Sequence, residues 1–340
     1  MVKKTTIYDI AKTLNITAAT VSRALNDNPK ISKKTKELVF ETANKMNYEQ
    51  NKLAQALKSG KSFNVGVIVP RIDSSFFSSV IRGIEEKLYP AGYHVIICQT
   101  HDQEKLEIKN INSLLNAQVD GVLMSISNGN LKINKSFDRL LSKNVPLIFF
   151  DRKKNIKNVS SITIDDFKGA YEATTHLIKQ GCKRIGHLSN NRNLEIFKNR
   201  YLGYKQAIID NGLDFDENLV LECFSDVQEG RKKVKMLLET DPTLDAIFSS
   251  SDFSALGAIQ EIKSQGLRIP EDICVVGFSN EPFTKFMELS ITSVDQSPLE
   301  MGRIAAQIFL EEVSNDVNIK SEKHVVLSPE LILRKSSQKL

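Results

Sequence analysis

The chain has 340 residues, of which 41% are hydrophobic, and a formal net charge of +5 at pH 7. This length is too great for one ordinary core, so we expect two or three domains, and the apolar fraction is sufficient to fill them. No apolar run reaches the roughly 18 residues of a membrane span, and the first residues, MVKKTTIYD, lack the apolar stretch of an export signal. We therefore expect a cytoplasmic protein that makes no membrane contact.

Positive charge is concentrated near the start of the chain. Residues 1–61 contain 12 Lys and Arg against 5 Asp and Glu, whereas the remaining residues contain 34 against 36. A basic module on a near-neutral body indicates a polyanionic partner at that end. The four cysteines are far apart, without a C-x-x-C pair or a histidine at ligand spacing, which predicts buried thiols and no metal site.

Residues 6–26 predict two short helices joined by a tight turn at Asn15. Thr6 is a candidate N-cap for the first helix, and Thr17 is the candidate cap of the second. Val21 and Leu25 of the second helix are predicted to face the first helix. Its outward positions are Ala18, Ala19, Ser22, Arg23 and Asn26. Small residues and one arginine on an outer face suit close approach to a DNA duplex, although a helical hairpin in a core is the alternative.

A third helix of about 15 residues is predicted after Ser32, which completes a small three-helix unit. The lysines near its start either contact phosphates or form a solvated face. Residues 51–60 read as a helix of about eight residues that Gly60 ends, and a helix this short is unstable alone in water. It is expected to form only against a partner, unless the stretch is an ordinary linker.

From residue 62 onward, short apolar runs alternate with helical stretches such as 76–89 and 167–179. The runs are 65–69, 95–98, 122–126, 147–150, 162–164, 185–188, 219–222, 246–248, 273–276, 291–294 and 325–327. This alternation predicts an α/β body of doubly wound parallel sheets, and the number of strands predicts two sheets with separate cores.

Several stretches resemble the lactose-repressor (LacI/GalR) family of bacterial transcription regulators. They are YDIA at 8–11, TAATVSRALN at 17–26, MNY at 46–48 and NKLAQALKSG at 51–60. The resemblance extends over nearly the whole chain. It implies an N-terminal helix-turn-helix headpiece at 1–50, a hinge helix at 51–61, and a body similar to periplasmic sugar-binding proteins. The implied subdomains of that body are 62–163 plus 293–323, and 164–292 plus 324–340.

The resemblance also implies which residues contact DNA. They are Thr6, Tyr8, Thr17, Ala18, Ala19, Thr20, Ser22, Arg23, Asn26, Tyr48, Asn51, Leu53, Ala54 and Leu57. Arg23 is suited to reading a guanine, and Leu57 matches a leucine that wedges open a base step in the minor groove. Gln50 departs from the proline that family members often have there, which leaves the connection to the hinge less restricted.

Ligands of such sheets lie beyond the carboxyl ends of the strands, here in a cleft between the two subdomains. The positions that match the family's effector pocket are Pro70, Phe76, Phe77, Ser125, Asp151, Ile164, Arg200, Phe224, Ser251, Asp252, Ser279 and Gln296. Arg200 offers a fork of donors to ligand oxygens, with a surface salt bridge as its alternative role. Asp252 either contacts the ligand or caps the following helix. Many relatives have an acid where this chain has Ser279.

These observations predict a transcription regulator, a repressor by resemblance, that binds a near-palindromic double-stranded DNA operator as a homodimer. A sugar or related metabolite in the cleft would control its affinity for DNA. An exported sugar-binding protein and a sugar-metabolising enzyme are the alternatives for residues 62–340. We expect no enzyme and no cofactor, because the sequence has no phosphate-binding, dinucleotide-binding, zinc-protease or nucleophile-elbow motif, and its five histidines are scattered.

Overall fold

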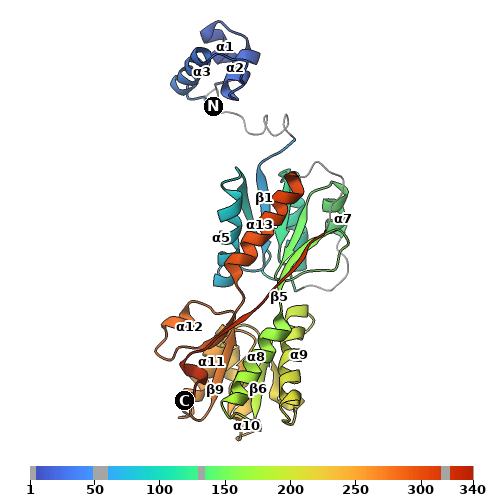
Figure 1. Cartoon of the computed structure of the whole chain (residues 1–340), viewed down its shortest axis with the longest axis vertical. Coiled ribbons are helices and arrows are strands. Elements are labelled where there is room, and N and C mark those ends of the chain that lie inside the picture. Colours follow the sequence, from blue (N-terminus) through green and yellow to red (C-terminus); the bar gives the residue numbers. More distant parts are fainter. Residues whose placement is uncertain (1–4, 49–59, 129–134, 315–321, 340) are drawn as a thin grey trace. The chain divides into compact units, whose positions relative to one another are not determined.

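The computed structural model describes residues 5–48, 60–128, 135–314 and 322–339. The chain divides into two compact units, Met1–Ser62 and Phe63–Leu340 (Figure 1). The expected hinge at 51–60, with Gln50, lies outside the described residues except for Gly60.

The first unit is a three-helix bundle of α1 (Ile7–Leu14), α2 (Ala18–Leu25) and α3 (Lys33–Lys45). Each helix begins at a residue whose side chain accepts a hydrogen bond from the backbone three residues on, as the sequence predicted for Thr6, Thr17 and Ser32. Asn15 adopts φ 51, a left-handed conformation that ends α1 and turns the chain toward α2.

The core of this unit is small and aliphatic. Its buried residues are Ile10, Ala11, Val21, Ala24, Val39 and Ala43. Leu38 and Val39 both fall among the apolar positions of α3, but Leu38 is 49% exposed because Val39 takes the inward position. Three short helices therefore close around one layer of side chains, and the outer face of α2 stays free of that core.

The second unit contains two six-stranded sheets among its described residues, which confirms the predicted doubly wound α/β body. The first sheet has the order β11-β5-β4-β3-β1-β2, and the second has the order β12-β10-β9-β8-β6-β7. All strand pairs are parallel except β10 with β12. The strands of the first sheet are β1 (Asn64–Val69), β2 (His94–Gln99), β3 (Gly121–Met124), β4 (Leu147–Phe150), β5 (Ser160–Ile164) and β11 (His324–Leu327). Those of the second sheet are β6 (Ile185–Ser189), β7 (Val220–Glu222), β8 (Ala246–Ser249), β9 (Cys274–Phe278), β10 (Thr292–Asp295) and β12 (Glu330–Ile332).

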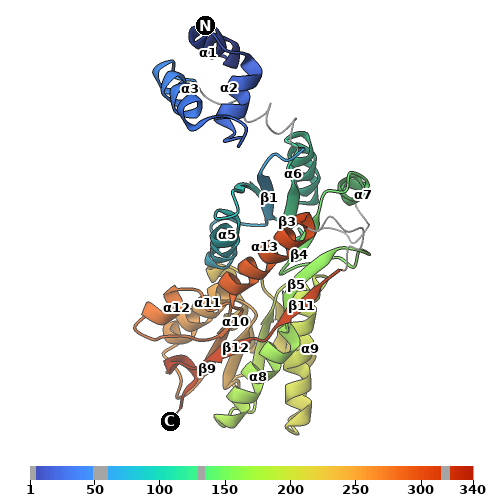
Figure 2. The same ribbon diagram turned by 45° about the horizontal axis from the view of Figure 1, so that its top comes forward.

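Helices cover both faces of each sheet and complete two lobes. In the first lobe the helices are α5 (Ser75–Leu88), α6 (Glu104–Asn116), α7 (Lys135–Ser142) and α13 (Pro298–Ser314). In the second lobe they are α8 (Asp166–Lys179), α9 (Glu195–Asp210), α10 (Val227–Thr240), α11 (Asp252–Ser264) and the short α12 (Phe283–Phe286), with 3-10 turns at Glu217–Leu219 and Lys335–Ser337. Figures 1 and 2 both show α13 lying alongside α5.

Each sheet face has its own apolar cluster. Val65 and Val67 pack under α5 and α13, whereas Ile68 and Val122 pack under α6 and α7. In the second lobe the corresponding faces are covered by α10 with α11 and by α8 with α9. The two sheets therefore have separate cores, as the number of apolar runs predicted.

Three segments connect the lobes, after β5, after β10 and after β11 (Figure 1). The first agrees with the expected crossing near Ile164. The other two come later than the expected boundaries at residues 293 and 324, because Thr292–Asp295 pairs with β9 in the second sheet and His324–Leu327 pairs with β5 in the first. The sequence analysis also missed β12, a three-residue edge strand that overlaps the apolar run 331–333.

Close helix packing depends on glycines at two facing positions. A Cβ on Gly302 of α13 would lie 2.0 Å from the Val80 carbonyl oxygen, and one on Gly83 of α5 would lie 2.1 Å from the Leu299 carbonyl oxygen. The two helices therefore touch backbone to backbone. A side chain larger than hydrogen at either position would force α5 and α13 apart.

Candidate functional site

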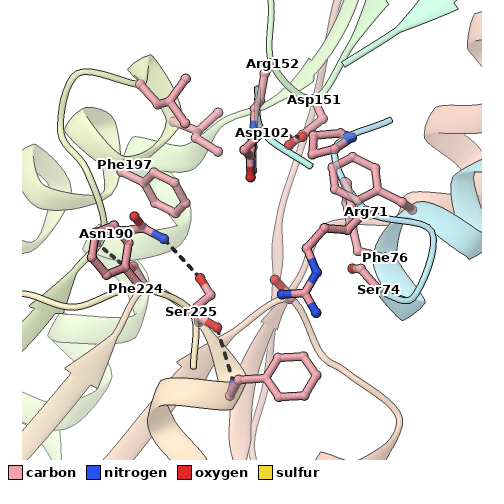
Figure 3. A pocket seen from close by; sticks show the side chains of 18 of the residues that line it. Arg71, Ser74, Phe76, Asp102, Asp151, Arg152, Asn190, Phe197, Phe224 and Ser225 are labelled. Atoms are coloured by element: carbon pink, nitrogen blue, oxygen red, sulfur yellow. Dashed lines mark hydrogen bonds and ion pairs between the residues drawn. The ribbon is translucent and has the colours of Figure 1, made fainter. Parts of the chain in front are cut away.

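A cavity of about 400 Å³ lies between the two lobes of the second unit (Figure 3). Its walls come from the loops that follow β1, β2, β3, β4, β6, β7, β8 and β9, together with the start of the second crossing segment. Carboxyl ends of parallel strands from both sheets thus meet at one place, as doubly wound folds predict. Figure 3 shows Arg71 and Phe76 of the first lobe opposite Asn190, Phe197 and Phe224 of the second.

Nine of the twelve predicted effector residues line this cavity. They are Pro70, Phe76, Phe77, Asp151, Arg200, Phe224, Ser251, Ser279 and Gln296. The other three do not line it. Ser125 lies behind Asp151 and donates a hydrogen bond of 2.9 Å to its Oδ2, while Ile164 lines a separate cavity of about 580 Å³ next to the crossing strands.

Arg200 is buried, and its guanidinium already has protein partners. Nε donates to Asp166 Oδ1 at 2.7 Å, Nη1 to the Ser250 carbonyl oxygen at 2.9 Å, and Nη2 to Gln296 Oε1 at 3.1 Å. The guanidinium carbon lies 3.6 Å from the centre of the Phe278 ring. Burial raises the pKa of Asp166 to about 6, and the positive charge of Arg200 opposes that rise. The arginine is therefore held rigidly, with its remaining N–H groups left for a ligand.

Asp165 and Asp166 are adjacent acids with different roles. By residue type both are candidate caps of a helix that starts at Phe167, but only Asp165 is one, by accepting a hydrogen bond of 2.9 Å from the Lys168 N–H. The helix begins one residue earlier, and the Asp166 side chain turns inward to the arginine.

A second charged group faces the cavity from the first lobe. Arg152 pairs with Asp102, and its Nε lies 3.6 Å from Asp151 Oδ2. Burial raises the pKa of Asp151, and Arg152 is the first of the groups that oppose the rise. Arg71 closes the rim through a two-pronged ion pair with Asp73, at 3.0 and 2.8 Å. The Asp73 hydrogen bonds raise the pKa of Arg71.

Ser279 and Gln296 form the floor between the lobes. Gln296 Nε2 donates a hydrogen bond of 2.9 Å to Ser279 Oγ, so this amide connects the serine to Arg200. Ser279 has φ 112 and Asn280 has φ 50, both rare for residues with a side chain. Asn280 binds Asp295 and Arg334 through its amide and does not line the cavity.

Asp252 has a structural position rather than a place on the cavity wall. Ser251 caps α11, and Asp252 is its first residue, fully buried. Its Oδ1 accepts a hydrogen bond of 2.6 Å from Ser293, and its Oδ2 accepts one of 2.7 Å from the Glu281 N–H. Ser251 rather than Asp252 is therefore the cap of α11, and the Asp252 carboxylate holds the loop after β9. Burial raises its pKa to about 7.

Asp252→Asn should reduce the pH dependence of the free energy of unfolding. The folded pKa of about 7 exceeds the ordinary value of 3.8, so the folded chain binds this proton first, and the stability of the wild type falls as pH rises through that window. Asparagine still accepts from the Glu281 N–H and can donate to Ser293. Urea unfolding measures the free energy of unfolding of both chains at pH 5 and pH 7.5, and the variant should be more stable relative to the wild type at pH 7.5 than at pH 5. The same difference between the two chains at both pH values would contradict the raised pKa of Asp252.

Cavity residues that the sequence analysis did not single out come mostly from loop interiors. They are Arg71, Ser74, Asp102, Asn128, Arg152, Asn190, Leu194, Ile196, Phe197, Ser225, Asp226, Ser250, Phe253 and Glu281. Most lie in loops that follow an apolar run and were expected to face the ligand. Asp102, Ser225 and Asp226 are the exceptions, because they follow β2 and β7, whose loops were not among those.

The outer face of α2 presents the predicted DNA contacts of the first unit. Thr17, Ala19, Arg23 and Asn26 are exposed, as is Thr6 at the start of α1. Tyr8 is 72% exposed. The remaining described candidates are partly buried, and they are Ala18, Thr20, Ser22 and Tyr48. Ala18 and Tyr48 also pack on the headpiece core. The candidates Asn51, Leu53, Ala54 and Leu57 lie outside the described residues.

Within the described ranges, no group of three or more potential ligand side chains is placed to hold a metal, and no helix is long and apolar enough to cross a membrane. His187 is fully buried and stacks on Tyr204 and Phe248, with distances of 4.8 and 4.9 Å between the ring centres. Burial lowers its pKa to about 4. This is a structural position, as we expected for the histidines.

Two family models match the chain. One, for bacterial regulatory proteins of the lacI family, matches residues 6–51, and the other, for periplasmic binding proteins and the sugar-binding domain of the LacI family, matches residues 62–333. The ribose operon repressor of Halalkalibacterium halodurans is 32% identical over 91% of this chain and 90% of its own.

Two solved structures are similar along the whole chain. The transcriptional regulator CelR in complex with cellobiose has a TM-score of 0.73 and 25% identity, and the match covers 98% of this chain and 100% of that one. The lac repressor dimer bound to operator and the anti-inducer ONPF has a TM-score of 0.85 at 22% identity, covering 98% and 99%. At that identity the second likeness shows the fold alone.

Proposed function

The chain belongs to the LacI family of bacterial regulatory proteins, which makes it a DNA-binding transcription regulator and not an enzyme, and from this premise we propose how it works. It binds a near-palindromic operator as a homodimer in the cytoplasm, and a small carbohydrate in the cavity between its lobes sets its affinity for that operator. The headpiece is residues 1–50 and the hinge is residues 51–61.

The cavity is the observation that carries this proposal. Aromatic rings from both lobes, such as Phe76 and Phe224, line it beside fixed polar groups, which suits the apolar face and hydroxyl rim of a sugar. A ligand that contacts both lobes stabilises the arrangement in which they are closed, and that differential binding is the source of control. CelR with cellobiose and the ribose operon repressor support a carbohydrate as the ligand class.

On the DNA side, α2 enters the major groove and Arg23 reads a base. The exposed guanidinium is long enough to reach a guanine edge, while Ala19 lets the helix backbone come close. Leu57 of the hinge wedges into a base step of the minor groove once the hinge helices pair across the dimer.

Arg23→Ala should cost about 1–3 kcal/mol in operator binding, confined to one base position of each half-site. The operator is first obtained by selecting random-sequence duplexes bound by the full chain, and affinities for single-base variants of it are then measured at fixed salt concentration. Lys45→Ala, which removes one exposed charge at the end of α3, is the control and should not change the base preference. A uniform loss on all sequences would assign Arg23 to phosphate instead.

The same titration tests the rest of the proposal. Leu57→Ala should strongly weaken specific binding while the melting temperature of the body is unchanged, and an unchanged operator affinity would exclude the wedge.

Melting of the full chain with monosaccharides, disaccharides, sugar phosphates and nucleobases tests the effector. A ligand at 100 times its dissociation constant stabilises by about 2.7 kcal/mol, a shift of a few degrees. A shift with nucleobases alone would contradict the carbohydrate assignment.

A further inference from the structure

Glu281 places a buried acid on the wall of the cavity. It is 5% exposed and lines the cavity beside Ser251, Phe253 and Ser279. Its backbone is fixed on both sides, because its N–H donates to Asp252 Oδ2 at 2.7 Å and its carbonyl oxygen accepts from Thr284 Oγ1 at 2.7 Å. The side chain therefore begins from a rigid position.

The carboxylate of Glu281 has no hydrogen-bond or ion-pair partner among the residues that the structure describes. Buried acids are normally paired, because removal from water without compensation is costly. The negative charge of Glu281 contributes to the raised pKa of Asp252, so it is unfavourable for the neighbouring carboxyl. The acid therefore faces the cavity without a protein partner among the described residues, at the place where a ligand would meet it.

The other acids of the cavity wall have protein partners. Asp151 accepts from Ser125, and Asp102 pairs with Arg152. Asp226 caps α10 by accepting from the N–H groups of Gln228 and Glu229, at 2.8 and 3.0 Å. Glu281 is therefore the acid of the cavity wall that remains for a ligand, among the residues that the structure describes.

We propose that Glu281 selects the effector by accepting hydrogen bonds from its hydroxyl or ammonium groups, so that the cavity takes neutral sugars or amino sugars and rejects phosphorylated and acidic ones. This rests on the proposed carbohydrate effector. A carboxylate forms strong bonds with hydroxyl and ammonium donors, whereas a second anion next to it is repelled. The rings of Phe253 and Phe224 provide the apolar contact for the sugar face.

The test compares matched ligands on the full chain and on one matched pair of variants. The ligands are glucose, glucosamine and glucose 6-phosphate, ribose and ribose 5-phosphate, and cellobiose. Glu281→Gln removes the charge and keeps the shape. Glu288→Gln removes the same charge from an exposed residue of the same lobe and is the control. The readouts are the melting shift, the dissociation constant and the operator affinity.

We expect a neutral or amino sugar to raise the melting temperature and its phosphate not to do so. Glu281→Gln should then weaken that ligand about tenfold or more, and Glu288→Gln should not change it. A larger loss for glucosamine than for glucose would identify an ammonium group as the donor. Tighter binding of the phosphate, or unchanged affinity in Glu281→Gln, would overturn the proposal.

The variants also give a result without any ligand. Glu281→Gln should melt at or above the wild type, because it removes an unpaired charge beside Asp252, whereas a lower melting temperature than Glu288→Gln would reveal a structural partner and overturn the proposal. Failure of the proposed function gives a different pattern. In that case no sugar shifts the wild type, or a sugar binds and the operator affinity stays the same.

Discussion

Replacement of Arg200 by methionine is expected to lower the free energy of unfolding by about 3–5 kcal/mol and to abolish effector binding. The ion pair with Asp166 is almost fully buried, with side chains 4% and 3% exposed. Without the guanidinium, the Asp166 carboxylate stays behind in a site that already raises its pKa to about 6. Gln296 and the Ser250 carbonyl lose their donors at the same time.

Two controls separate these effects. In the double variant Asp166→Asn with Arg200→Met no buried charge remains, so much of the stability should return while ligand binding stays lost. The defect of the single variant should also shrink as pH falls. The loss of Arg200 raises the folded pKa of Asp166 further. As the pH falls, the folded variant therefore binds this proton earlier than the wild type does, and it recovers stability. Urea unfolding of the single variant that matches wild type at pH 7 would contradict this account.

Gly302→Ala should destabilise the first lobe by about 3 kcal/mol. The added methyl would lie 2.0 Å from the Val80 carbonyl oxygen, and neither backbone can move aside without separating α5 from α13. Alanine ordinarily favours a helix over glycine by about 1 kcal/mol, so the predicted sign is opposite to that of helix propensity.

A second glycine gives the matched comparison. On Gly169 of α8 the nearest atoms would be side-chain carbons of Val294 and Phe278 at 3.1 and 3.2 Å, which can adjust. Gly169→Ala should therefore cost much less. Thermal melting of both variants measures the difference, and a Gly302→Ala chain that melts at or above the wild type would show that the helices can part without loss.

The sequence predicted local features well because their causes are local. The caps at Thr6, Thr17 and Ser32 follow from residue type and spacing, and each apolar run became a strand. β12 was missed although it overlaps the apolar run 331–333, because it is short and its pairing in the second sheet depends on where the chain returns.

The site was predictable to the level of loops rather than side chains. Strand ends identified which loops meet, and most matched positions do line the cavity. The roles of individual acids were not predictable. Asp166, Asp252 and Glu281 all occur in loops or at helix starts, yet one pairs with arginine, one holds a loop and one faces the cavity. Which role each takes depends on partners that are far away in sequence, such as Arg200 and Ser293.

The three crossing segments determine when this protein can fold during its synthesis. The first lobe needs α13 and β11, which supply Met301, Phe309 and Val325 to its core, yet these residues leave the ribosome after almost the whole second lobe. The second lobe in turn needs β12, which comes later still. A nascent chain that ends near residue 297 therefore has two unfinished sheets, whereas the three-helix unit is already complete. The first sheet lacks β11 and the helix α13 that covers one of its apolar faces, and the second lacks its edge strand β12. Chaperone demand should be greatest in that interval and should end with the last strand.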